Sequence, residues 1–226
     1  MLNHHLMSSI IRFEQVSVAA HEKMILSNIS FALMRGDKAA LCGKSGSGKS
    51  SVLRTIMGLH TLQSGTVYFQ EKPLTPLSLQ AVRSGIAYIG QEPMLGADEV
   101  RDALLLPFQF KAHHHQRPSE NQLLEVLHRL RLPADILNAK SSRISGGEKQ
   151  RIALARGLLL DKKLYLLDEV TSALDMESKQ AVFDVFSDPQ FTVLSVTHDQ
   201  DWMERSDSVF ELEAGHLIKV GRHGNT

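Results

Sequence analysis

Apolar and polar positions alternate along the first part of the chain, as in β-strands with one buried face. Between residues 10 and 34 apolar residues recur two positions apart, and residues 65–69 form another short segment of this kind. The triplet 35–37, Arg-Gly-Asp, interrupts the pattern and predicts a turn. These segments predict an antiparallel sheet near the start of the chain.

Other segments are short apolar runs, which are typical of strands buried on both faces of a parallel sheet. They cover residues 38–42, 86–89, 164–167 and 191–197. The tail, residues 208–218, has the pattern of two strands joined at residues 213–215. Strands that alternate with helices predict an α/β fold.

Helical spacing dominates the middle of the chain. One helix is expected over residues 100–106, ended by Pro107. Another is expected to begin at Ser119, because Gln122 stands three residues later in capping-box spacing. The run His113-His114-His115 lies between them, and a solvated loop is favoured over a metal site because useful ligand partners are missing. The pattern therefore predicts a helical insertion within the α/β fold.

Composition narrows the function only slightly. The 226 residues are 42% hydrophobic and 22% charged, with zero formal net charge, which gives no support for nucleic acid as the main partner. The single cysteine, Cys42, excludes an internal disulfide and suits a reducing compartment. No secretory signal and no run of 18 apolar residues are evident, so any function at a membrane is expected to require a separate membrane partner.

The segment 43–50, Gly-Lys-Ser-Gly-Ser-Gly-Lys-Ser, matches the phosphate-binding pattern G-x-x-x-x-G-K-[ST], between an apolar strand and a helix. Its glycines allow backbone N–H groups to approach phosphates, Lys49 adds charge for the β- and γ-phosphates, and Ser50 can ligate Mg²⁺. A turn that binds nothing is disfavoured by the complete pattern. The predicted nucleotide contacts are Gly43, Lys44, Ser45, Gly46, Ser47, Gly48, Lys49, Ser50 and Ser51.

Polar residues follow two of the buried strands. Asp168 can hold Mg²⁺, and the next residue, Glu169, can act as a general base toward an attacking water. His198 ends the other strand; alone it would be a structural histidine, but beside a triphosphate it can stabilise charge on the γ-phosphate. Together these residues predict hydrolysis of a nucleoside triphosphate.

A further segment, residues 145–148, opens a helix with two glycines in its first turn. Ser145 and Glu148 have capping-box spacing, so helix initiation explains part of the pattern. Gly146 and Gly147 are unfavourable in a helix, and a cap alone does not require them. We interpret Ser145, Gly146, Gly147 and Glu148 as a second anion-binding site at a helix N-terminus.

The complete set of motifs resembles the ATP-binding cassette (ABC) family. The order is that of the family over nearly the whole chain: Walker A at 43–50, Gln91, the signature at 144–148, Walker B at 164–169, the D-loop at 172–175 and the switch histidine His198. The resemblance implies a P-loop (RecA-like) core with a β-subdomain, residues 1–91 and 161–226, and a helical signature subdomain, residues 92–160. All of residues 1–226 would form one ABC ATPase domain.

The resemblance also implies a mechanism. Two copies would form a homodimer with two ATP molecules, each held by Walker A of one chain and by the signature of the other. Gln91 would contact Mg²⁺ or the attacking water, and Asp175 would cross the dimer interface. Hydrolysis would drive a transmembrane permease subunit, with the chain peripheral on the cytoplasmic face of the inner membrane.

Two positions depart from the family pattern. The last signature residue is usually glutamine and here is Glu148, which we expect to preserve activity. Ala20 stands where the family usually stacks an aromatic residue on adenine, and His21 is a possible substitute. Loss of stacking predicts weaker adenine affinity, because a base–aromatic stack is worth roughly 1–3 kcal/mol.

Within the family, the chain resembles most closely the ATPase subunits of bacterial two-component exporters assigned to iron export. The ATPase motifs do not report the cargo, so an importer or a lipoprotein-release system is the alternative. ATPases that act on DNA or ribosomes are disfavoured: only 54 positions separate Gln91 from Ser145, too few for a long coiled coil, and there is a single cassette.

Overall fold

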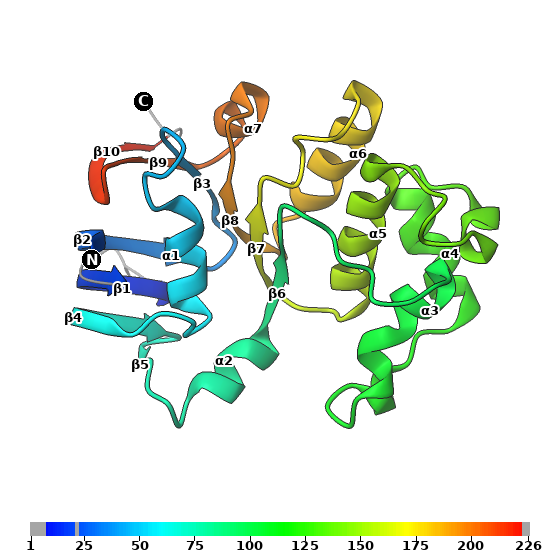
Figure 1. The fold of residues 1–226 in the computed structure, drawn as a ribbon, viewed down its shortest axis with the longest axis horizontal. Coiled ribbons are helices and arrows are strands. Elements are labelled where there is room, and N and C mark those ends of the chain that lie inside the picture. Colours follow the sequence, from blue (N-terminus) through cyan, green and yellow to red (C-terminus); the bar gives the residue numbers. More distant parts are fainter. Residues whose placement is uncertain (1–7, 21–22, 223–226) are drawn as a thin grey trace, which may run out of the picture.

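The computed structural model describes residues 8–20 and 23–222. Its strands form two sheets, and the antiparallel sheet and the mixed sheet lie side by side in Figure 1. The antiparallel sheet has the order β2-β1-β4-β5, and its strands are β1 (Ser9–Ala20), β2 (Lys23–Met34), β4 (Leu62–Phe69) and β5 (Lys72–Pro73). The antiparallel sheet expected from the alternating pattern is therefore present.

The mixed sheet has six strands in the order β10-β9-β3-β8-β7-β6. Strands β9, β3, β8, β7 and β6 run parallel, and β10 pairs antiparallel with β9. Their bounds are β3 (Lys38–Cys42), β6 (Ile86–Ile89), β7 (Leu164–Asp168), β8 (Thr192–Val196), β9 (Ser208–Glu213) and β10 (His216–Arg222). The parallel arrangement brings the carboxyl ends of β3, β8, β7 and β6 to one edge, where ligands bind in α/β folds.

The helices lie around the mixed sheet. Figure 1 shows α3, α4 and α5 gathered at the end of the molecule away from the antiparallel sheet, while α1 lies between the two sheets. The helices are α1 (Lys49–Ile56), α2 (Leu79–Gly85), α3 (Val100–Leu105), α4 (Glu120–Arg129), α5 (Gly146–Leu159), α6 (Met176–Phe186) and α7 (Gln200–Glu204). Short 3-10 helices cover Leu106–Gln109, Ala134–Asn138 and His114–Gln116.

Two apolar cores explain why strand β7 is continuously apolar. Tyr165 and Leu167 pack into a core shared with α3, α4 and α5, whereas Leu164 and Leu166 pack into the core below the antiparallel sheet. Successive residues of a strand point to opposite faces, so a strand between two cores requires apolar side chains at every position. The expectation of a strand buried on both faces is confirmed.

The structure differs from two local expectations and adds one helix that the sequence did not predict. Helix α3 ends at Leu105, and Pro107 does not stop the chain but stands in the first turn of a 3-10 helix, where its missing N–H costs nothing. Helix α2 was not expected, because Val82 is its only buried residue. The His113–His115 run includes part of a short 3-10 helix rather than only a loop.

The described residues contain neither a cluster of metal-ligating side chains nor a helix that could span a membrane. Among the described residues, no group of three or more His, Cys, Asp or Glu side chains could hold a metal ion. None of the helices in the described part is long and apolar enough to cross a membrane.

Candidate nucleotide site

The glycine loop connects β3 to α1 in backbone conformations that favour glycine. Gly43, Gly46 and Gly48 have φ angles of 128°, 77° and 106°. A Cβ atom on Gly43 would stand 2.0 Å from the carbonyl oxygen of Leu212, whereas one on Gly46 would meet nothing within 4 Å. Gly43 is therefore required by packing inside the chain, and Gly46 leaves an open face for a ligand.

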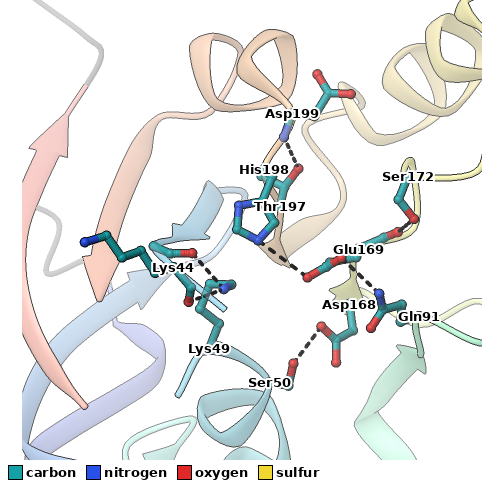
Figure 2. A network of polar contacts seen from close by, with 11 residues as sticks. Lys44, Lys49, Ser50, Gln91, Asp168, Glu169, Ser172, Thr197, His198 and Asp199 are labelled. Atoms are coloured by element: carbon teal, nitrogen blue, oxygen red, sulfur yellow. Dashed lines mark hydrogen bonds and ion pairs between the residues drawn. The ribbon is translucent and has the colours of Figure 1, made fainter. Parts of the chain in front are cut away.

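Lys49 begins helix α1 and is almost fully buried, at 5% exposure. Its Nζ donates to the carbonyl oxygens of Gly43 at 2.8 Å and Lys44 at 3.0 Å, so the ammonium group lies within the loop (Figure 2). The side chain of Lys44 is 90% exposed, and its ammonium is 3.9 Å from a carboxylate oxygen of Glu213. Lys49, and not the Lys44 side chain, supplies the cation of the loop.

Ser50 and Asp168 meet at the carboxyl end of β7. Ser50 Oγ donates to Asp168 Oδ1 at 3.0 Å, and the Tyr88 hydroxyl donates to Asp168 Oδ2 at 3.4 Å. Asp168 is 4% exposed. A hydroxyl and a carboxylate side by side next to a phosphate-binding loop are the oxygen ligands that Mg²⁺ accepts. The donor set therefore fits the predicted Mg²⁺.

Glu169 turns away from the strand that it follows. Its φ angle of 51° lies in the left-handed region, which is uncommon for residues other than glycine. Its N–H donates to the Val196 carbonyl at 2.9 Å, and its own carbonyl accepts from Ser172 Oγ at 2.9 Å. These two backbone contacts fix the conformation that directs the side chain out of the sheet.

The Glu169 carboxylate stands between two further polar side chains. Gln91 Nε2 donates to Glu169 Oε2 at 3.0 Å, and His198 Nε2 is 3.7 Å from Glu169 Oε1 (Figure 2). The three residues follow β6, β7 and β8, which are neighbours in the sheet. The parallel topology therefore brings together Gln91, Asp168, Glu169 and His198, which the sequence assigned to one site.

Ser145 and Glu148 form the expected capping box at the start of α5. The Ser145 N–H donates to Glu148 Oε2 at 2.7 Å, and the Glu148 N–H donates to Ser145 Oγ at 3.2 Å. Hydrogen bonds from Ser145 hold the pKa of Glu148 below its usual value. A carboxylate at the last signature position thus has a local role at the positive end of a helix.

The signature residues lie beside the segment 172–175. A Cβ atom on Gly147 would approach the Ala173 carbonyl oxygen to 3.0 Å. Asp175 is the N-cap of α6 and accepts from the Ser178 N–H at 2.8 Å, which lowers the pKa of Asp175. In Figure 1, α5 and α1 lie on opposite sides of β7, so these residues are separate from the glycine loop of the same chain.

Helix α5 also holds the loop that carries Gln91. Gln150 Nε2 donates to the Gly90 carbonyl at 3.3 Å. The Arg156 guanidinium donates to the carbonyls of Leu95 at 2.8 Å and Met94 at 2.9 Å, and its burial lowers the pKa of Arg156. Sequence reasoning missed these two residues and Tyr88, because their contacts exist only in the folded chain.

Comparison with known proteins places the chain in a family. The family profile described as ABC transporter matches residues 26–172, which carry the glycine loop, Gln91, the signature and Asp168–Glu169. The chain belongs to the ABC transporter family. As an ABC cassette it binds ATP and hydrolyses it, and it is an ATP-binding subunit of the ABC transporter type.

Two of the similar proteins match this chain over nearly their whole length, and a third is much longer. The Escherichia coli (strain K12) protein named probable iron export ATP-binding protein FetA is 36% identical over 210 residues, 91% of this chain and 92% of FetA. A structure described as the dimeric MJ0796, a bacterial ABC transporter cassette, has a TM-score of 0.81 at 26% identity and covers 95% of this chain and 100% of that cassette. Human antigen peptide transporter 2 is 30% identical, but the chain spans only 32% of its length.

His21, the possible substitute for the adenine-stacking aromatic residue, lies outside the described residues. Ala20, at the position usually taken by that aromatic residue, is the last residue of β1. The expectation of weaker adenine binding therefore stays a prediction.

Proposed function

We propose that the chain hydrolyses ATP with Glu169 as general base and that this turnover drives a separate membrane subunit. The observation that carries the proposal is the position of the Glu169 carboxylate, between Gln91 and His198 and next to the Ser50–Asp168 pair. Figure 2 shows the Glu169 carboxylate with Gln91 on one side and His198 on the other.

The glycine loop binds and orients the triphosphate. Its backbone N–H groups and the buried Lys49 ammonium balance phosphate charge, and the helix dipole of α1 adds to them. Ser50 and Asp168 would hold Mg²⁺, which when bound neutralises charge on the β- and γ-phosphate oxygens. Loop and side chains together keep the γ-phosphate at the edge of the sheet.

Glu169 and its neighbours act on the attacking water. The carboxylate accepts a proton from the water, and Gln91 holds the carboxylate in place through its Nε2 donor. His198, at the opposite side of the carboxylate, donates to the γ-phosphate as charge develops.

The second half of each site comes from another copy of the chain. Helices α5 and α6, whose N-caps are Ser145 and Asp175, lie on the other side of β7 from α1 in Figure 1, and the space next to Gly146 is open. An ATP molecule held by Lys49 can therefore meet the signature of a partner copy. The dimeric MJ0796 structures, one of which is described as bound to ADP and Pi, support this arrangement.

Glu169→Gln tests the proposed base. The amide keeps the side-chain shape but cannot accept the proton, so we expect turnover to fall by about 10²–10⁴-fold. ATP binding should persist and dimers should accumulate in size-exclusion chromatography with ATP and Mg²⁺. The matched control is Glu125→Gln on the exposed face of α4, which should turn over ATP like the parent. Parental turnover in Glu169→Gln would exclude Glu169 as the base.

The proposed partner is a transmembrane permease, which would place the chain on the cytoplasmic face of the membrane. Iron export is the proposed process, supported by the likeness to FetA over nearly the whole chain. Affinity capture of the tagged chain from detergent-solubilised membranes should recover one multispanning protein. Cells that lack the chain should then retain more iron, and an unchanged iron content would exclude iron as the cargo.

A further inference from the structure

The backbone around His198 is fixed through both neighbouring residues. The Thr197 N–H donates to the Leu41 carbonyl of β3 at 3.1 Å, and the Asp199 N–H donates to Thr197 Oγ1 at 3.0 Å. The His198 side chain itself is 53% exposed, and its Nε2 is 3.7 Å from Glu169. The position of the imidazole therefore depends on how Thr197 and Asp199 are held.

Asp199 is held by an ion pair with α6. Lys179 Nζ lies 2.6 Å from Asp199 Oδ2, and the two side chains are only 26% and 10% exposed (Figure 2 shows the position of Asp199). The other oxygen, Oδ1, accepts from the N–H groups of Asp201 at 3.1 Å and Trp202 at 3.4 Å. Burial acts to raise the pKa of Asp199, but the Lys179 ammonium and the N–H groups of Trp202 and Asp201 together outweigh it, and the net shift is downward.

Helix α6 links this ion pair to the segment 172–175. The Asp175 side chain caps the helix, and the Lys179 N–H donates to the Asp175 carbonyl at 2.9 Å, one helical turn later. Lys179 and Asp199 also line a hollow of about 340 Å³ together with Glu169 and His198. The ion pair is thus within the same hollow as the proposed catalytic side chains.

We propose that Lys179 is a positioning residue for ATP hydrolysis, because its ammonium holds Asp199 and thereby keeps His198 facing Glu169. This inference rests on the proposed roles of Glu169 and His198. Lys179 is not placed to bind a phosphate itself, because its charge is already balanced by Asp199 and the carboxylate of Glu169 faces the same hollow. Its effect on hydrolysis is transmitted through the backbone of residues 197–199.

Lys179→Gln tests the inference, because it removes the charge and keeps most of the side chain. A misplacement of about 1 Å in a reacting group costs up to ~100-fold, so we expect kcat to fall by about 10- to 100-fold. The KM for ATP should stay within about twofold of the parent, because binding relies on the distant glycine loop. Lys179→Arg keeps the charge and should restore most of kcat.

The matched control is Lys163→Gln. Lys163 also forms an ion pair, with Asp161 at 3.0 Å, but both side chains are largely exposed, and the pair is not part of the hollow. Its loss should leave kcat and KM unchanged. Thermal unfolding of all variants separates positioning from folding, since a purely structural role would lower the Tm of Lys179→Gln and leave kcat per folded molecule intact.

The outcomes distinguish this inference from the proposed function. Parental kcat in Lys179→Gln, together with inactive Glu169→Gln and His198→Ala, overturns the positioning role alone. Parental turnover in Glu169→Gln instead overturns the proposed function. If Lys179→Gln does not fold, Asp199→Asn removes the same ion pair while its amide oxygen can still accept from the N–H groups of α7, and the same loss of kcat is expected.

Discussion

The hydroxyl of Tyr165 is buried in an apolar core. The side chain has zero exposure, and its hydroxyl has no hydrogen-bond partner among the described residues. Its ring packs edge-on against Phe186 and Phe191, with ring centroids 5.0 Å and 5.1 Å apart. Burial raises the pKa of the phenol. Tyr165→Phe removes only the oxygen and keeps the aromatic contacts.

The expected gain follows from the cost of a buried, unpaired hydroxyl. That cost is about 1–3 kcal/mol, so Tyr165→Phe should stabilise the fold by up to this amount. For a domain of this size 1 kcal/mol corresponds to about 2–4 °C, which gives a rise in Tm of about 2–12 °C. Differential scanning calorimetry without nucleotide measures the shift, and urea unfolding measures the free energy.

Tyr88→Phe is the matched control. The Tyr88 hydroxyl donates to Asp168 and the residue is 38% exposed, so removing this oxygen should not stabilise the protein. A fall in the Tm of Tyr165→Phe, or equal shifts in both variants, would refute the reasoning. Such a result would mean that the Tyr165 hydroxyl gains a favourable partner, such as a buried water.

Three further variants test other parts of the structure. Gly43→Ala should destabilise the protein by at least ~1–3 kcal/mol in urea unfolding, because φ is positive and the added carbon meets the Leu212 carbonyl; Gly46→Ala, which lacks the overlap, should cost less. Glu148→Gln should lower the urea midpoint at pH 7, because it removes a carboxylate that stabilises the start of α5. The difference from the parent should shrink below pH 4.5, because the carboxylate has a lowered pKa and its contribution to stability is lost when it is protonated. Equal differences at pH 7 and at acid pH would contradict this assignment. Arg156→Met should make amide hydrogen exchange of Met94 and Leu95 about 10-fold faster or more, because two hydrogen bonds worth ~1 kcal/mol each are lost. Parental exchange rates would show that these hydrogen bonds do not hold the loop.

The sequence predicts the parts of the fold that depend on local chemistry. Both capping boxes, at Ser119 and at Ser145, are present because each is complete within four consecutive residues. The end of β7 at Asp168 and the end of β8 at Val196, two residues before His198, also follow from the sequence, since apolar runs end where the chain leaves the sheet. Parallel strands then place such ends at a common edge, so the assembly of the site could be expected from topology.

Contacts between distant side chains were not predictable. Lys179 and Asp199 are 20 residues apart, and nothing in either segment signals that α6 brings them together. Arg156 looks like an ordinary basic residue near a helix end, although its partners are the backbone carbonyls of Met94 and Leu95. Carbonyl acceptors exist at every residue, so a pattern of side chains cannot identify them.

The hydrogen bonds between α5 and the loop that carries Gln91 mean that the helix can tilt when the loop moves, as a lever does. Gln150 and Arg156 attach helix α5 to the two ends of the loop, at Gly90 and Leu95. Ser145 is the N-cap of the same helix. At 1.5 Å per residue, Ser145 lies about 16 Å along the axis from Arg156, so a tilt of about 10° moves it by roughly 3 Å. That distance is the length of a hydrogen bond. In the proposed dimer, a small displacement of the loop would therefore decide whether the signature residues of α5 reach the phosphate held by the other copy.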